Sequence, residues 1–219
     1  MTMNATHLKL ITGAYFSGKG YLIDLHPDAD ETGLKPDIIV VKPVKRLLHK
    51  RMERGAAPAC LLHLLDKKSW RSLDYIIAET GYRADFIQAV LGDAEKAGWV
   101  ESKSDAAGRP EWMIKDYVAP VSECIYVCCG IEDPLAARDI LGKTRGCYHR
   151  AYMVFPYYVN DALLHDCRRD ELGVLVFDEK SGCFDEQLRA HRLKITDRKT
   201  FLAISEKIVT NHCVSLKMT

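Results

Sequence analysis

One short segment near the N-terminus has the residue types of a phosphate-binding loop. Gly13, Gly18 and Lys19 meet the pattern G-x-x-x-x-G-K, in which backbone N–H groups and the lysine hold phosphate oxygens. The next residue is Gly20 rather than Ser or Thr, so the hydroxyl that would hold a magnesium ion is missing. Such a loop must also open a helix, whereas the apolar run 21–26 indicates a strand. The sequence therefore predicts a hairpin turn here.

Positive charge is concentrated in the segment 42–54, although the 219-residue chain has a net charge of only +1. Apolar residues in this segment have helical spacing, and the opposite face is basic. A strip of this kind can contact the phosphates of a nucleic acid. The expected nucleic-acid contacts are Lys42, Lys45, Arg46, Lys50 and Arg51 in the strip, and Arg138 and Arg145 in a second basic group.

The eight cysteines include no C-x-x-C pair, so a zinc finger is not expected. A chain of this length does not need disulfide bonds to fold, and we expect reduced thiols in a cytoplasmic protein. No run of eighteen apolar residues is present, so no membrane span is expected. The N-terminus lacks the features of a signal peptide. These features imply no cofactor.

Apolar runs outside residues 57–117 predict an α/β architecture. Strands are expected at 7–12, 21–26, 38–41, 123–131, 151–155 and 173–178, and helices at 44–54, 133–150, 160–169 and 197–210. Alternating strands and helices in the second half favour a mostly parallel sheet covered on both faces. The strands before residue 44 have no other core to join, so residues 1–56 and 118–219 are expected to form one discontinuous α/β domain.

Residues 57–117 resemble a winged helix-turn-helix domain. The pattern predicts a helix over 58–67, a second helix capped by Ser72, a turn at Gly81, a third helix over 83–97 and a hairpin with its loop at 105–110. The phrases DAEKAGWVES and GRPEWMI carry the likeness. The inner face of the third helix is assigned to Phe86, Val90, Leu91 and Ala94, and the expected nucleic-acid contacts are Arg83, Gln88 and Arg109.

The sequence around this insert resembles the core of the PD-(D/E)XK, or restriction-endonuclease-like, superfamily. The likeness rests on Pro36-Asp37 entering an apolar strand, on a later strand and helix, and on the phrases AYMVFP and LGVLVFD. The resemblance implies an α/β fold with a mixed sheet flanked by helices, interrupted here by the winged helix. It also implies a site in which two acids hold Mg²⁺ and a lysine assists the nucleophile.

The residues of that catalytic site are incomplete in this sequence. Asp37 fits the first acid and would be the metal ligand. The second acid and the lysine should alternate along the next core strand, where Tyr126 and Cys128 stand instead. A displaced site would draw its second acid and its lysine from Glu123, Asp24, Lys143 and Lys42.

Three functional hypotheses follow from these features. The leading one is a DNA-binding protein with a catalytically inactive nuclease-like core, possible as a homodimer because two-fold symmetry matches duplex DNA. The enzyme alternative is a Mg²⁺-dependent endonuclease with displaced acids. The third is a regulator that binds a ligand or partner in its α/β part and uses the winged helix for protein contact. The net charge of residues 66–116 is negative, so we expect the surrounding core to bind phosphate better than this module, which can contact either DNA or a protein.

Overall fold

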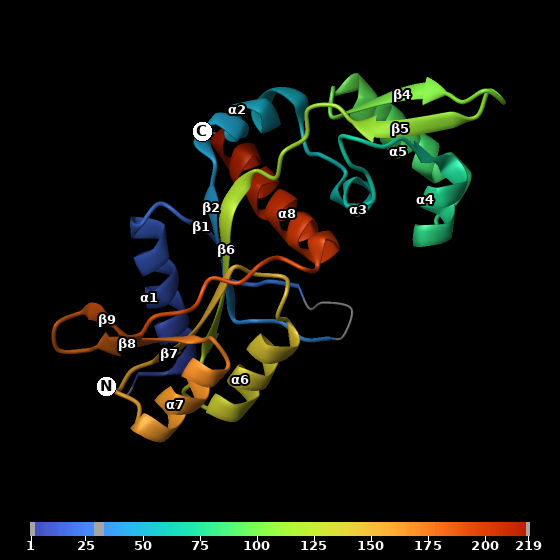
Figure 1. Ribbon diagram of the computed structural model, residues 1–219. Coiled ribbons are helices and arrows are strands. Elements are labelled where there is room, and N and C mark those ends of the chain that lie inside the picture. The colour runs from blue at the N-terminus through green and yellow to red at the C-terminus, as the bar shows by residue number, and fades with distance from the viewer. Residues whose placement is uncertain (1–2, 29–32, 218–219) are drawn as a thin grey trace. The chain divides into compact units, whose positions relative to one another are not determined.

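The computed structural model describes residues 3–28 and 33–217. Contacts between residues divide the chain into two compact units: unit 1 consists of Met1–Pro43 and Val121–Phe201, and unit 2 of Val44–Pro120 and Leu202–Thr219. Their helices and strands are labelled in Figure 1. Residues 44–56, 118–120 and 202–219, which the sequence analysis assigned to the α/β part, group with unit 2.

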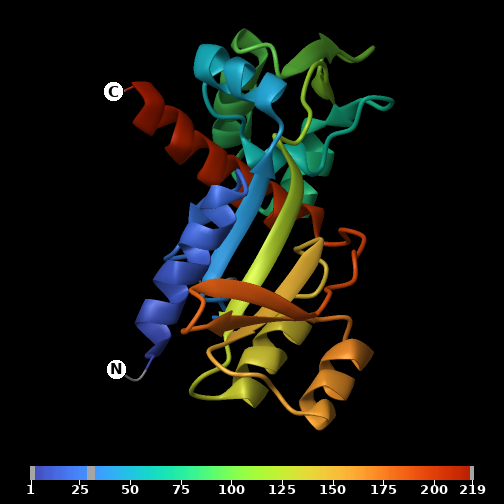
Figure 2. The ribbon, with the colours of Figure 1, turned by 90° about the vertical axis from the view of Figure 1, so that its left-hand side faces the viewer.

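Unit 1 contains a six-stranded mixed sheet. In their order across the sheet, the strands are β1 (Leu22–Asp24), β2 (Ile38–Pro43), β6 (Val121–Cys129), β7 (Arg150–Phe155), β8 (Gly173–Asp178) and β9 (Cys183–Leu188). β6 pairs with β7, and β7 with β8, in parallel, whereas the other three pairs are antiparallel. Figure 2 shows β2 and β6 side by side. An α/β fold with a mixed sheet flanked by helices is confirmed.

The expectation of a mostly parallel sheet is wrong for a topological reason. Parallel neighbours need a long crossover connection, and helices supply one only between β6 and β7, through α6 (Pro134–Lys143), and between β7 and β8, through α7 (Asp161–Arg169). β9 returns from β8 through a tight turn that contains Gly182 at a φ of 68°. The sequence analysis missed β9 because its sequence CFDEQL is polar and lacks an apolar run.

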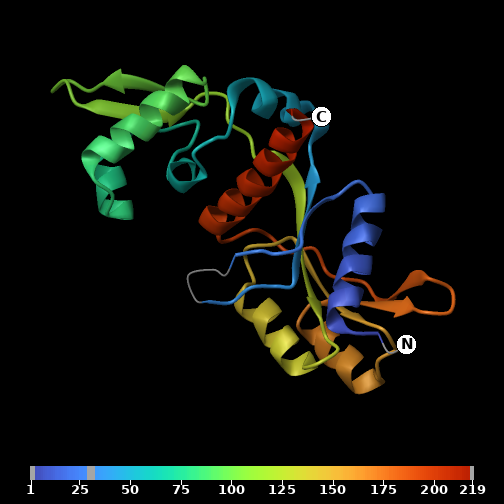
Figure 3. The ribbon, with the colours of Figure 1, turned by 180° about the vertical axis from the view of Figure 1, so that it is seen from behind.

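Helices cover both faces of this sheet. Alternate residues of a strand point to opposite faces. On one face Ile125 and Tyr152 pack with Leu8 and Phe16 of α1 (Ala5–Gly18). On the other face, the sulfur of Cys167 in α7 lies 3.7 Å from that of Met153 in β7. Figures 1 and 3 show α1 and α6 on opposite sides of the sheet.

The prediction of a strand at 7–12 is wrong, because this segment lies inside α1. The Asn4 side chain caps the helix by accepting a hydrogen bond from the His7 N–H. Leu8, Thr12 and Phe16 are buried at a spacing of four residues, which is a helical period. The predicted hairpin turn over 13–20 is also wrong, since the helix continues to Gly18. The segment therefore ends a helix, whereas a phosphate-binding loop would begin one.

Unit 2 combines helices with a small sheet. Its elements are α2 (Lys45–Arg54), α3 (Ala59–Leu62), β3 (Arg71–Ser72), α4 (Leu73–Thr80), α5 (Ala84–Lys96), β4 (Val100–Ser104), β5 (Pro110–Ile114) and α8 (Arg198–Lys217) from residue 202 onward. The sheet order is β3-β5-β4, and both pairs are antiparallel. The predicted cap at Ser72 and the turn at Gly81 are confirmed: Ser72 accepts from the Tyr75 N–H, and Gly81 is left-handed.

The predicted inner face of α5 is confirmed for Leu91 and Ala94 but is wrong for Phe86. Ile87, Leu91 and Ala94 are buried, whereas Phe86 is 46% exposed. Helical spacing is equally consistent with a buried face that is rotated by one residue. Which of the two faces is buried depends on the side chains of the unit that pack against the helix. The first helix is also shorter than predicted, because α3 has four residues. The predicted helices over 133–150 and 197–210 correspond to Pro134–Lys143 and Arg198–Lys217.

Candidate functional site

Asp37 lies directly before β2 and beside the end of β6. Its Oδ2 accepts a hydrogen bond from the Cys129 backbone N–H at 2.7 Å. In the register of the two strands, Ile38 is opposite Val127. Asp37, at the start of β2, therefore lies next to β6. In β6 the sequence analysis expected the second acid and the lysine of a catalytic site.

The two positions of β6 that were expected to hold the second acid and the lysine carry neither residue type. Tyr126 and Cys128 occupy the two expected positions, and they are only 3% and 1% exposed. Burial raises the pKa of the Cys128 thiol to about 12, so the sulfur is neutral near pH 7. The Tyr126 ring packs against Tyr148, with 5.1 Å between ring centroids. Both side chains belong to the hydrophobic core and cannot hold a magnesium ion.

Glu123 lies far from Asp37, at the opposite end of the β2–β6 pair. It is opposite Lys42 in the register, five residues along β2 from Asp37. This corresponds to roughly 16 Å along the strand. Glu123 is also two residues from Ile125, and its side chain therefore faces α1. Asp37 and Glu123 cannot share one metal ion.

Glu123 is instead the centre of a hydrogen-bonded network. Its Oε2 accepts from the Tyr21 hydroxyl at 2.6 Å, and its Oε1 accepts from Arg150 Nε and Arg192 Nη1, each at 3.0 Å. Burial opposes ionisation, but the hydrogen bonds from Tyr21 and Arg150 and the nearby positive charges outweigh it and lower the pKa of Glu123. Burial and the Glu123 carboxylate raise the pKa of Tyr21, which keeps its hydroxyl a donor.

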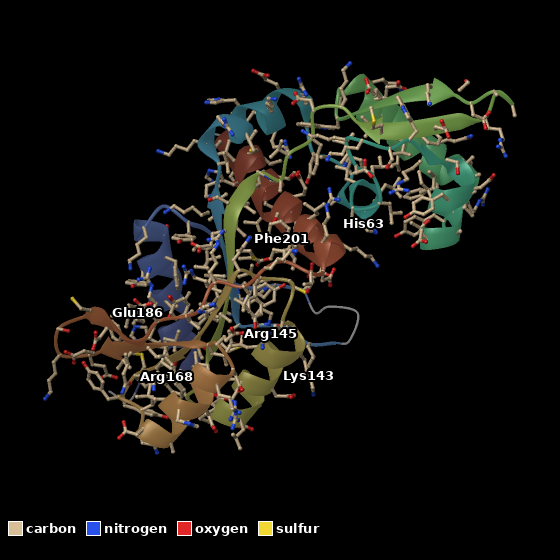
Figure 4. All side chains as sticks on the ribbon, viewed as in Figure 1. His63, Lys143, Arg145, Arg168, Glu186 and Phe201 are labelled. Carbon is tan, nitrogen blue, oxygen red and sulfur yellow. The ribbon has the colours of Figure 1, made fainter. Side chains whose placement is uncertain are left out.

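Lys143, the third candidate of the nuclease hypothesis, does not meet the other two. It lies at the end of α6 and pairs with Asp139 one turn earlier, at 2.6 Å (Figure 4). Asp24, in β1, is opposite Ile39, and its Oδ1 accepts from the His26 N–H. Over residues 3–28 and 33–217, no group of three His, Cys, Asp or Glu side chains is arranged to hold a metal ion. The residues that the resemblance assigns to a magnesium site do not fit that ion here.

Arg51 is the one predicted nucleic-acid contact that is buried. It is 3% exposed and donates to both oxygens of Glu206, at 3.1 and 2.7 Å. The Tyr117 hydroxyl donates to the same carboxylate at 2.9 Å. The Arg51 guanidinium also lies 4.3 Å from the centroid of the Trp99 ring. The prediction that Arg51 contacts a phosphate is wrong, because its side chain is buried in unit 2 and donates its hydrogen bonds to Glu206.

Most of the other predicted cations already have acidic partners. Arg138 is the least exposed of these and bridges Asp166 and Asp170. The remaining pairs are Lys50 with Asp116, Arg83 with Asp85, Arg109 with Asp105 and Asp74, and Arg145 with Glu171. Pairs between exposed side chains contribute little to stability, so a phosphate can replace the acid in them. Gln88 is exposed on α5.

Lys45 and Arg46 differ from all of these. Both are exposed in the first turn of α2, and within residues 3–28 and 33–217 neither has an ion-pair partner. Lys42, in β2 of unit 1, is exposed as well, and its Nζ lies 5.0 Å from the centroid of the Tyr21 ring. These three residues are the predicted cations that have no carboxylate partner in the described part of the chain.

Sequence analysis missed the partners of Glu123, namely Tyr21, Arg150 and Arg192. The sequences of two strands indicated that Glu123 and Arg150 could lie near each other. In β6 and in β7 a charged residue stands two positions before an apolar one: Glu123 before Ile125, and Arg150 before Tyr152. Such spacing places both polar groups on one face of adjacent strands. The alignment of β6 with β7 that brings them together could not be derived from the sequence.

Comparisons with known proteins found no match among protein-family models, curated proteins or solved structures. Among the described helices, none combines the length and the apolar character that a membrane crossing requires. The function is therefore argued from the residues and their geometry.

Proposed function

We propose that this protein binds nucleic acid without cleaving it, and that the first turn of α2 is its phosphate contact. The observation that carries this proposal is the pair of exposed cations, Lys45 and Arg46, with no acidic partner in the described chain. Three of the five basic residues of α2 already pair with acids, Arg51 with Glu206 and Lys50 and Arg54 with Asp116, so the charge that α2 offers to a polyanion is that of Lys45 and Arg46.

The helix end itself favours an anion. The first N–H groups of a helix lack partners within the helix and carry partial positive charge. In α2 no described side chain caps them, and the first turn has no acidic residue. Two further cations at this end are unfavourable for the isolated helix. A backbone phosphate would satisfy the N–H groups and balance both side chains at once.

The arrangement of elements supports the family resemblance as part of this proposal. Asp37 enters β2 beside the end of β6, as the PD-(D/E)XK likeness requires. The order α3, β3, α4, α5, β4, β5 with the sheet order β3-β5-β4 supports a winged helix in unit 2. The missing acid and lysine at the end of β6 favour a core that has lost magnesium-dependent cleavage.

Binding is tested by fluorescence anisotropy with a labelled duplex at low ionic strength. We expect Lys45→Ala/Arg46→Ala to weaken binding at least about tenfold, because two phosphate contacts are lost. The matched control is Lys67→Ala/Lys68→Ala, two adjacent exposed lysines of the same unit, which should leave the affinity within about threefold of the parent. Equal losses in both variants would contradict a site on α2.

Cleavage is tested separately with supercoiled plasmid and Mg²⁺ or Mn²⁺. The proposal predicts no nicking above that of a mock preparation. Nicking that disappears in Asp37→Ala would support the endonuclease alternative instead. Cleavage that depends on Asp37 can be told apart from a failure of binding, because the binding assay tests Lys45 and Arg46 and the cleavage assay tests Asp37.

A second candidate role for unit 2 is protein contact through α5. Tyr82 and Phe86 are 41% and 46% exposed and stack edge to face, with 5.2 Å between ring centroids. Asp85, Asp93 and Glu95 make the exposed surface of the same helix acidic, which opposes entry into a DNA groove. If α5 contacts protein, Gln88→Ala and Arg83→Ala leave duplex affinity unchanged. A loss of tenfold or more in either variant would place α5 on the nucleic acid.

A further inference from the structure

A pocket of about 270 Å³ lies on the α1 face of the unit 1 sheet. Its floor is apolar and is formed by Ile125 of β6, Tyr152 of β7 and Leu175 of β8, each less than a tenth exposed. Phe16 of α1 adds an aromatic wall. Pockets that bind small molecules usually combine such a floor with a few convergent polar groups.

Two cations at the pocket carry no carboxylate partner. Lys19 follows the end of α1, contacts the Tyr15 hydroxyl, and has its Nζ 3.9 Å from the centroid of that ring. Arg189 follows β9 and is exposed. In the part of the chain that the structure describes, neither side chain has an acidic oxygen within ion-pair distance. The pocket therefore offers two positive groups to an anionic ligand.

The two carboxylates of the pocket are in different states. Glu123 accepts hydrogen bonds from Tyr21, Arg150 and Arg192, and the two arginines already neutralise its negative charge. Glu186 of β9, labelled in Figure 4, accepts one hydrogen bond, from the Tyr152 hydroxyl at 2.6 Å. No cation among the described residues pairs with it. Glu186 is thus a negative group that a ligand can neutralise.

We propose that this pocket binds a small amphoteric molecule of the amino-acid type with an apolar side chain. Its carboxylate would lie between Lys19 and Arg189, its ammonium group against Glu186, and its side chain on the apolar floor. A simple anion would meet the Glu186 carboxylate, and a simple amine would meet the two cations. Only a ligand with both charges matches all three groups, each through a charge-assisted hydrogen bond.

The test is isothermal titration calorimetry of the full chain against the twenty amino acids. We expect at least one apolar or aromatic amino acid to bind. For phenylalanine as the binder, 3-phenylpropionate lacks the amine and phenethylamine lacks the carboxylate, and each should bind at least about tenfold more weakly. The proposal is overturned if no amino acid binds, if the analogue without the amine binds equally well, or if a nucleoside monophosphate binds more tightly than any amino acid.

Variants locate the binding in this pocket. Glu186→Gln keeps an acceptor for Tyr152 but removes the charge, and we expect it and Arg189→Ala to weaken binding at least about tenfold. The matched controls are Asp185→Asn, the neighbouring position of β9, and Arg168→Ala on α7, both exposed. These controls should bind as the parent does. Unchanged affinity in Glu186→Gln, with circular dichroism showing a folded protein, would exclude the site.

Discussion

The inner and outer faces of α2 show why positive charge in a sequence does not by itself locate a binding surface. On the inner face Arg51 is buried against Glu206 and Trp99. On the outer face Lys45 and Arg46 are exposed and lack acidic partners among the described residues. The three residues stand within one short helix, yet the first is a structural group and the other two are free to bind a ligand. Burial with a charged partner separates the two roles.

The largest effect is expected at Arg51. Arg51→Ala leaves the Glu206 carboxylate buried without its charged partner and should reduce the free energy of unfolding of unit 2 by about 3–5 kcal/mol. All three tryptophans of the chain, Trp70, Trp99 and Trp112, lie in unit 2. Urea unfolding followed by tryptophan fluorescence therefore reports on this unit.

A double variant sharpens the same prediction. Arg51→Met/Glu206→Gln removes both charges and keeps an acceptor for the Tyr117 hydroxyl. It should recover at least about 1 kcal/mol of the loss measured for Arg51→Ala. If the double variant is the less stable of the two, then the buried charge is not the reason for the effect of the single one.

A smaller effect is expected from Glu123, which is the centre of a charged network with Arg150 and Arg192 in unit 1. Its lowered pKa means that the folded state favours the ionised carboxylate. The stabilisation is therefore present above the unfolded pKa of about 4.3 and is lost as the pH falls through the lower folded value. At pH 7, Glu123→Gln should reduce the free energy of unfolding by about 1–2 kcal/mol.

The measurement for this prediction is urea unfolding followed by the tyrosine band of the near-ultraviolet circular dichroism, between pH 7 and pH 3. The difference between the parent and Glu123→Gln should shrink below about pH 4. The control is Glu132→Gln, an exposed carboxyl beyond the end of β6. A pH-independent difference between Glu123→Gln and the parent would show that geometry, not charge, accounts for it.

The smallest effect on stability is expected on the outer face of α2. Cations in the first turn are repelled by the helix end. Lys45→Ala/Arg46→Ala should therefore leave the free energy of unfolding of unit 2 unchanged or raise it by up to about 0.5 kcal/mol in the absence of nucleic acid. The tryptophan signal measures this too. A loss of 1 kcal/mol or more would mean that these side chains support the fold.

Local patterns predicted the elements that carry their own signals. The β-branched run of β2, the strand GVLVFD of β8 and the caps Ser72 and Gly81 were all recognised. The predictions that were wrong concern segments whose structure is decided by contacts with other parts of the chain. The segment 7–12 has an apolar pattern that suits a strand or a helix, and the capping by Asn4 and the packing against the sheet decide for the helix.

The candidate sites were less predictable than the fold. The family resemblance related Asp37 to the strand of Tyr126 and Cys128, and in the structure Asp37 accepts a hydrogen bond from the Cys129 N–H of that strand. Arg51 could not be separated from its exposed neighbours, since its partner Glu206 is 155 residues away in the chain. The pocket on the α1 face draws on residues from Tyr15 to Arg189, and it is defined only once the strand order is known.

The most direct test of the central claim is the salt dependence of duplex binding by the parent and by Lys45→Ala/Arg46→Ala. Each phosphate contact contributes about 0.9 to the slope of log affinity against log salt concentration. If both side chains contact phosphates, the variant slope should be shallower by roughly 1.8. An unchanged slope, or no binding by the parent at low ionic strength, would contradict the account.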